Sequence, residues 1–237
     1  MRVIELRNYR LADGRTGEFI RYFEEHFLVS QRDEGMHVLG QFAVVDHPDR
    51  FVWIRGFADR AARLRGLTGF YDGAFWLARR ETANAMILEH HDVHLLRPLD
   101  AIERMTGGAS LDDRAREPAG LTPPSTGLVV VDFYRAAGAR ERLVDVFEAR
   151  VRPALADHGY AVVGHFVAEL TPNDYPRLPA TQDPALLVVL TACRDQAHHA
   201  RLTAGWRLPA EARALLTADV TTLLLRPTAR SLVRFQG

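Results

Sequence analysis

The tetrapeptide Leu95-Leu96-Arg97-Pro98 recurs near the other end of the chain as Leu224-Leu225-Arg226-Pro227. Further residues recur in the same order between the two copies, most of them 124 positions apart. An ordered repeat of this length indicates two homologous halves. The matching residues are Tyr9-Arg10 with Tyr134-Arg135, Phe23-Glu24 with Phe147-Glu148, Gly35 with Gly159, Gly40 with Gly164, and Phe42 with Phe166.

The repeat divides the chain into residues 1–99 and residues 127–237. Between them, residues 100–126 contain the stretches Thr106-Gly107-Gly108-Ala109-Ser110 and Leu121 to Gly127, whose Gly, Pro and Ser content is typical of a linker. A short helical run is expected at residues 100–105. The first half carries the candidate site, and the second is expected to be a degenerate copy.

Each half follows the order strand, helix, strand, strand, helix, strand. Residues 3–11 alternate between apolar and polar side chains, which is the period of a half-buried strand. Phe19, Phe23 and Phe27 keep helical spacing until Gly35 ends the run. The remaining expected elements of the first half are strands at 37–45 and 51–57, a glycine-interrupted helical region at 58–80, and a last strand at 89–98.

This element order predicts the ferredoxin-like βαββαβ unit, an antiparallel four-stranded sheet with two helices on one face. The other sheet face would be bare in a single copy. We therefore expect an α+β protein in which two tandem ferredoxin-like units pack sheet to sheet as a pseudo-dimer, with a ligand cavity between the sheets. Uncovered sheet edges also favour a homodimer.

Composition narrows the classes of function. The 237-residue chain is 47% hydrophobic, and its 30 basic residues balance 30 acidic ones. A neutral chain has no long-range field for nucleic acid or an anionic membrane, so neither is an expected partner. Every basic residue is arginine, which excludes Schiff-base chemistry through a lysine. The single cysteine excludes a disulfide framework.

The first residues, Met1-Arg2-Val3-Ile4-Glu5, alternate between charged and apolar types and do not form the apolar core of a signal peptide. No run approaches the ~18 apolar residues that a membrane span needs. We therefore expect a soluble, cytoplasmic protein.

Several motifs of the first half are familiar together. They are Ile4-Glu5-Leu6-Arg7-Asn8-Tyr9, Phe23-Glu24-Glu25-His26, Leu39-Gly40-Gln41-Phe42, the segment from Phe70-Tyr71 to Trp76, and Leu95-Leu96-Arg97-Pro98. With these motifs the first half resembles the NIPSNAP family, and the second half carries only the skeleton of that likeness. The resemblance implies a dimeric α/β-barrel fold, which cofactor-free antibiotic-biosynthesis monooxygenases share, and it supplies no catalytic signature.

Strand alternation predicts which side chains share a sheet face. We expect the more apolar set, with Ile4, Leu6, Val52, Ile54 and Val93 among its members, to face the helices. The opposite set would then point into the barrel as a cavity wall. Its members are Arg7, Tyr9, Trp53, Arg55, His90, Asp92 and His94, with Asn84 near the cavity mouth.

The sequence Glu89-His90-His91-Asp92-Val93-His94 is the densest group of ionisable residues. Residues four apart on a strand lie about 13 Å apart, so His90 and His94 cannot both join Asp92 on one metal ion. No metal site is therefore assigned, although Asp92 with one histidine could still combine with a distant histidine.

Acid–base chemistry fits the spacing better, because Asp92 could orient His90 or His94 as a base while Arg7 or Arg55 binds an anion. We predict catalytic roles for His90, Asp92 and His94, and substrate binding by Arg7, Tyr9, Trp53, Arg55 and Asn84. The expected ligand is a small aromatic or enolisable molecule, with cofactor-independent oxygenase or isomerase activity and no cofactor. Two alternatives stay open: a non-catalytic binding or assembly protein, and a metal-dependent enzyme.

Overall fold

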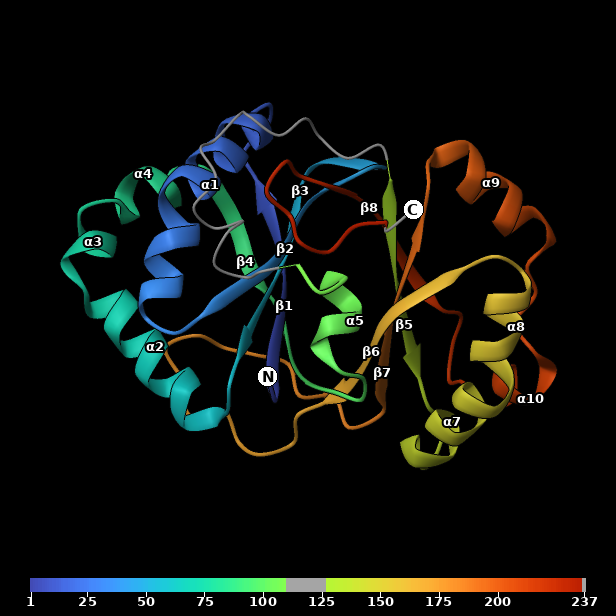
Figure 1. Ribbon diagram of the computed structural model, residues 1–237. Coiled ribbons are helices and arrows are strands. Elements are labelled where there is room, and N and C mark those ends of the chain that lie inside the picture. Colours follow the sequence, from blue (N-terminus) through green and yellow to red (C-terminus); the bar gives the residue numbers. More distant parts are fainter. Residues whose placement is uncertain (110–126, 236–237) are drawn as a thin grey trace.

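The computed structural model describes residues 1–109 and 127–235. Eight strands form one closed antiparallel barrel in the order β1-β3-β2-β8-β5-β7-β6-β4. Each half supplies four consecutive strands of that order, and the two sheets are joined where β2 pairs with β8 and β4 pairs with β6. Helices cover the outside of the barrel in two groups, one on each side (Figure 1). The expected α+β fold, two ferredoxin-like units packed as a barrel-type pseudo-dimer, is confirmed.

The first half begins with β1, whose alternating residues predicted a strand, followed by a helix that ends before Gly35 at a φ of 74°. That positive φ suits glycine, as expected from the helix-stop signal. Gly66 and Gly69 do not interrupt the second helix, which continues to Asp72. The elements are β1 (Val3–Leu11), α1 (Thr16–Asp33), β2 (His37–Val44), β3 (His47–Phe57), α2 (Arg60–Asp72), α3 (Ala74–Leu77), α4 (Arg80–Asn84) and β4 (Ile87–Pro98).

The second half repeats this order after the short helix α5 (Ile102–Thr106). Its first helix contains a π-helical turn between two α-helical segments. The elements are β5 (Leu128–Arg135), α7 (Arg140–Val146), η1 (Phe147–Val151), α8 (Arg152–Asp157), β6 (Ala161–Ala168), β7 (Leu186–Cys193), α9 (Gln196–Gly205), α10 (Ala210–Arg213) and β8 (Thr221–Pro227). Most of the predicted linker, residues 110–126, and the last two residues lie outside the described residues, so the domain boundaries stay a prediction.

The interior of the barrel is filled by one apolar cluster drawn from both halves. Ile4, Leu6, Val52 and Ile54 from the first half pack there with Val188 and other residues of the second half. The expectation that these first-half residues face the helices is therefore wrong. They point inward, and their strand neighbours point outward toward α1 and α2.

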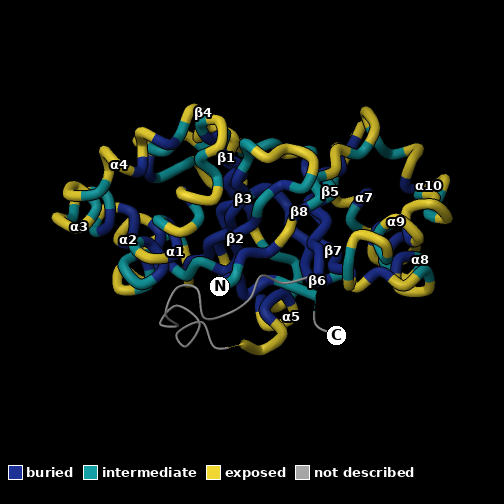
Figure 2. Tube along the Cα trace, turned by 90° about the horizontal axis from the view of Figure 1, so that it is seen from above, coloured by how far each residue is buried: buried dark blue, intermediate teal, exposed yellow. Residues whose placement is uncertain are grey.

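On β1 and β3 the period of two was correct and the side on which each set lies was inverted. On β4 the expected sides are correct, because Val93 pairs with the outward-facing Arg7 while His94 and Leu96 point into the barrel. In this fold both faces of every sheet are buried, as the dark central strands in Figure 2 show. Polarity then does not distinguish the two faces. The outward-facing charges of β1 and β3 are covered by apolar helix residues and form ion pairs with one another, whereas a solvated face would leave them in water.

Closure of the barrel removes the reason given for a homodimer. Each of the eight described strands is hydrogen-bonded to a neighbour on both sides, so none of them leaves an open edge. A homodimer stays a prediction without that support. Within the described residues, no helix combines the length and the apolar character needed to cross a bilayer.

Candidate functional site

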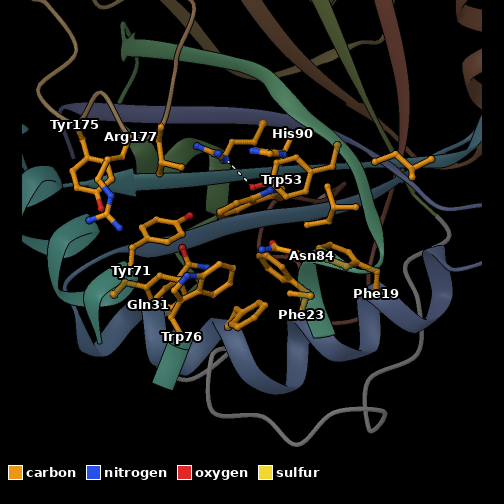
Figure 3. Close-up of a pocket in the computed structure, with 18 residues that line it drawn as sticks. Phe19, Phe23, Gln31, Trp53, Tyr71, Trp76, Asn84, His90, Tyr175 and Arg177 are labelled. Atoms are coloured by element: carbon orange, nitrogen blue, oxygen red, sulfur yellow. Dashed lines mark hydrogen bonds between the residues drawn. The ribbon is translucent and has the colours of Figure 1, made fainter. Parts of the chain in front are cut away.

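A cavity of about 400 Å³ lies in the first half, between the outer face of β1 and β3 and the helices that cover it. Figure 3 shows side chains from the strands and from α1 facing each other across this space. It is therefore outside the barrel, whereas the sequence placed a cavity between the two sheets. The lining residues are Arg7, Tyr9, Phe19, Phe23, Phe27, Gln31, Trp53, Phe70, Tyr71, Trp76, Ala83, Asn84, Ile87, Leu88, His90, Tyr175, Arg177 and Leu178.

Aromatic rings form most of the wall. The helical spacing of Phe19, Phe23 and Phe27 aligns three rings along the face of α1 that meets the sheet. Phe23 packs against Trp53 of β3 with ring centroids 5.0 Å apart, and Tyr9 meets Trp53 edge-on at 5.9 Å. Flat rings in fixed orientations make a surface suited to a planar aromatic ligand.

A buried network of charged side chains lies behind this aromatic wall. Glu5 accepts hydrogen bonds from three guanidinium groups, at 2.9 Å from Arg7, 2.8 Å from Arg55 and 2.8 Å from Arg63. Glu5, Arg55 and Arg63 are fully buried, and Arg7 is 1% exposed. Three cations sharing one carboxylate are held rigidly, because each bond is charge-assisted and water is excluded.

The network is not neutral. Arg63 forms a second ion pair with Asp174, which also pairs with Arg60, so four guanidinium groups face two carboxylates. Burial alone would raise the pKa of Glu5, but Arg55, Arg7 and Arg63 outweigh it and hold that pKa far below the ordinary value. The surplus positive charge lies beside the cavity, and Arg7 is the member of the network that lines it.

Arg7 is positioned to bind an anion. Its Nη1 donates to Glu5, and its Nε donates to the hydroxyl of Tyr9 at 3.1 Å, which leaves Nη2 without a hydrogen bond within the described chain. Burial raises the pKa of the Tyr9 hydroxyl, and the neighbouring guanidinium groups lower it. Burial has the larger effect, so the pKa is raised overall. Tyr9 therefore stays a neutral phenol, and the charge on Arg7 remains available.

His90 and Asn84 lie at the mouth of the cavity, where both side chains are exposed. The ring of His90 contacts Tyr9 at 6.3 Å between centroids. Partial burial, with further contributions from His91 and Arg7, lowers the pKa of His90. Its imidazole is thus neutral at pH 7 and can accept a proton.

The second half contributes the roof of the same cavity. Residues 169–185, which connect β6 to β7, cross over to the first half (Figure 1). Thr181 exchanges backbone hydrogen bonds with β4, donating to Val93 at 2.7 Å and accepting from Leu95 at 3.1 Å. The loop brings Tyr175 and Arg177 to the cavity, with Tyr175 stacked on Tyr71 at 6.2 Å (Figure 3).

The predicted site residues divide between two places. Arg7, Tyr9, Trp53, Asn84 and His90 come together around the cavity, and Arg55 lies directly behind Trp53, with its guanidinium carbon 5.0 Å from the ring centroid. Their expected position inside the barrel is wrong, for the reason given above. Whether they bind or transform a ligand stays a prediction.

Asp92 and His94 lie on the other face of β4. His94 is paired with Leu6, and its ring meets Phe133 of the barrel core at 5.2 Å. Asp92 orients His94 at 3.3 Å and accepts a hydrogen bond from Asn8 at 2.9 Å. A register irregularity between β1 and β4 at residues 8–10 separates this pair from His90, which regular alternation had placed on the same face.

The described residues contain no set of side chains that could serve as metal ligands. Over residues 1–109 and 127–235, no group of three or more His, Cys, Asp and Glu side chains is arranged to hold a metal ion. The neighbours of His90 in the cavity are mainly aromatic rings and arginines, and they include no second imidazole, thiolate or carboxylate that could coordinate a metal ion with it.

Sequence reasoning missed the helix residues of the wall and the roof loop. One signal could have revealed the loop. The equivalent connection in the first copy is the hairpin between β2 and β3, which consists of residues 45–46 alone. Residues 169–185 are therefore an insertion in the second copy. Long connections of this kind commonly carry function.

Comparison with known proteins shows which fold the chain has and does not assign it to a family. No family model matches the chain, and no curated protein matches it. Among solved structures, a proposed monooxygenase from Lactobacillus acidophilus NCFM is similar over 96% of both chains, with a TM-score of 0.58 and 11% identity. An anthrone oxidase-like protein is similar over 96% of this chain and 91% of its own, with a TM-score of 0.53 and 10% identity.

The NIPSNAP resemblance is supported only in part. A NIPSNAP family protein from Agrobacterium tumefaciens aligns with 41% of this chain and 86% of its own, at 20% identity and a TM-score of 0.38. Such a match covers one half of the duplicated chain, while the full-length matches share the whole barrel. The chain therefore has the dimeric α/β-barrel fold, with both units of the dimer contained in one polypeptide.

Proposed function

We propose that the first-half cavity binds a planar aromatic molecule as its phenolate or enolate and that the protein catalyses its oxidation by molecular oxygen without a cofactor. The observation that carries this proposal is the buried Arg7, which has one unengaged guanidinium nitrogen beside an aromatic cavity. The proposed monooxygenase and the anthrone oxidase-like protein that share the fold fit the proposal by analogy only.

Arg7 would select the anionic form of the ligand. The Glu5 network holds more positive than negative charge, and a bound oxyanion would offset the surplus. Because Arg7 is buried and held in place, its guanidinium would lower the pKa of a bound phenol or ring ketone more than a guanidinium in solution does. The rings of Tyr9, Trp53 and Phe23 would hold the ligand plane.

His90 would act as the base at the cavity mouth. Its neutral imidazole takes one proton from a ring methylene group, and the resulting enolate is stabilised by Arg7. The enolate carbon then transfers electrons to O2 and forms a C–O bond. Loss of the second ring hydrogen with cleavage of the O–O bond gives a ring carbonyl and water, so that R2CH2 and O2 become R2C=O and H2O.

Anthrone is a suitable probe, since it is a fused-ring ketone with one reactive methylene group. We expect the purified protein to consume oxygen and to form anthraquinone, and we expect His90→Ala to slow turnover by about 100-fold or more while binding is retained. His90 is exposed, so the variant should fold. An unchanged rate in His90→Ala would remove the proposed base.

Arg7→Met tests the anion site separately. Glu5 keeps Arg55 and Arg63 in this variant, so the fold is expected to survive, as circular dichroism would verify. Loss of one charged hydrogen bond should weaken binding of 1-naphthol, followed by tryptophan fluorescence, by about 10-fold to 100-fold. Binding without any turnover in the wild type would instead support the non-catalytic alternative, and equal binding by both proteins would contradict the anion site.

A further inference from the structure

The second half has its own cavity, of about 280 Å³, at the position equivalent to the first one. It lies between the outer face of β5, β7 and β8 and the helices of that half. Its lining residues are Val130, Asp132, Tyr134, Leu155, Tyr160, Thr191, His199, Thr203, Trp206, Leu208, Val220 and Thr222. None of these residues takes part in the function proposed above.

The two cavities carry opposite charges at equivalent strand positions, Arg7 in the first and Asp132 in the second. Arg7 pairs with Trp53 across β1 and β3, and Asp132 pairs with Val189 across β5 and β7. A tyrosine follows two residues later in each copy. The duplicated backbone thus presents a guanidinium group to the first cavity and a carboxylate to the second.

The Asp132 carboxylate has no counter-ion. Its partner is the hydroxyl of Thr222, which donates a hydrogen bond at 2.6 Å, and no ion pair reaches Asp132 from the described residues. Glu5 and Arg55 of the first half are replaced by Val130 and Thr191, so the charge network has no counterpart here. Burial raises the pKa of Asp132 to about 6, which leaves it ionised at pH 7.5. An ionised group in this position costs stability unless a cation pairs with it.

The walls around Asp132 favour a cation with an organic body. Tyr160 meets Trp206 edge-on at 6.0 Å, and Tyr134 lines the same space. Burial, with a contribution from Asp132, raises the pKa of Tyr160 to about 12 and that of Tyr134 further, so both rings remain neutral. Neutral electron-rich rings attract an ammonium group through their faces.

His199 does not compete with such a cation. Burial lowers the pKa of His199, so its imidazole is uncharged at pH 7.5. Its Nδ1 is enclosed and has no hydrogen-bond partner in the described structure. A neutral imidazole with an unengaged nitrogen is one more polar group available to a ligand.

We propose that the second cavity is a separate binding site for a small organic ammonium ion, with Asp132 as its counter-ion and Tyr134, Tyr160 and Trp206 as its aromatic walls. The molecule would then bind ligands of opposite charge in its two equivalent cavities. The argument rests on the uncompensated carboxylate and the rings around it, and it is independent of the function of the first cavity.

Titration calorimetry with benzylammonium, and with benzyl alcohol as its neutral counterpart, tests the site. We expect saturable binding of the ammonium compound at pH 7.5 and at least tenfold weaker binding of the alcohol. Asp132→Asn keeps the acceptor for Thr222 and removes the charge, and it should weaken ammonium binding at least tenfold. The control Glu18→Gln, which removes an exposed carboxylate outside both cavities, should bind it with wild-type affinity.

The pH dependence separates this site from unspecific binding. The ionisable groups that face Asp132 are Tyr134 on β5, Tyr160 before β6 and His199 on α9. Asp132 loses its charge as the pH falls through about 6, so affinity should fall about tenfold from pH 7.5 to pH 5 in the wild type and clearly less in Asp132→Asn. Absence of binding at millimolar benzylammonium, or equal binding by the wild type and Asp132→Asn, would overturn the proposal.

Discussion

The two halves share one backbone plan and differ in how they pair the charges on the strand faces that meet the helices. In the first half, Glu5 holds three guanidinium groups behind an aromatic cavity. In the second half, Val130 stands at the equivalent place, and Asp132 is left with a threonine hydroxyl. The comparison shows that a strand position facing the helices can carry opposite charges in the same fold, because the surrounding side chains set the cost of burial.

The largest effect is expected from breaking the network of the first half. Glu5→Gln would leave Arg7, Arg55 and Arg63 buried with no shared carboxylate, and removal of one partner of a buried charge network costs about 3–5 kcal/mol. Urea denaturation should show this loss in the free energy of unfolding. Glu18→Gln, in an exposed pair with Arg15, is the control and should leave the unfolding curve unchanged.

The pH dependence of the same group has a definite sign. The pKa of Glu5 is lowered from its ordinary value of 4.5, so its contribution to stability is complete above about pH 4.5 and is lost as the pH falls further. Wild-type stability should therefore decline below pH 4.5 more steeply than that of Glu5→Gln. Parallel curves for the two proteins would contradict the role given to Glu5.

A smaller effect of the opposite sign is expected in the second half. The pKa of Asp132 is raised from 3.8 to about 6, so ionised Asp132 costs stability above pH 6, and the cost disappears as the pH falls toward 3.8. Asp132→Asn should stabilise the ligand-free protein by about 1–3 kcal/mol at pH 8 and by less than about 1 kcal/mol at pH 4. A destabilised variant at pH 8 would mean that Asp132 has a stabilising partner.

The smallest effect is expected from Asp92→Asn. Asp92 contacts His94 and Asn8 on the barrel side of β4, whereas the cavity lies on the other side. With His90 as the base, anthrone turnover by this variant should stay within about twofold of the wild type. A loss comparable to that in His90→Ala would show that the cluster acts as one unit, as the sequence alone suggested.

Local patterns predicted the duplication, the order of elements and the period of each strand. The helix α1 ends before Gly35, and β4 ends at Pro98, because glycine and proline impose local backbone constraints that need no tertiary context. Arg7 with Tyr9 on β1, and Trp53 with Arg55 on β3, were grouped correctly for the same reason, since alternation along a strand is a property of the strand itself. Asp92 and His94 were placed in the same set and lie on the other face.

The position of the site was not available from local patterns. A strand that is buried on both sides gives no contrast between a core face and a solvent face, so Glu5 and Arg7 looked like residues of a wet interior. The register irregularity opposite Asn8 then moved His90 away from Asp92, which no alternation rule reveals. The roof residues Tyr175 and Arg177 come from the other half of the chain.

The sequence by itself determined that this chain is two βαββαβ copies and which side chains of each strand lie together, because both follow from spacing along the backbone. Only the tertiary structure decided that the arginine-bearing face meets the helices and that a loop of one copy closes the cavity of the other. The physical reason is that burial and charge compensation depend on all the residues around a group, and most of those residues are distant in the chain.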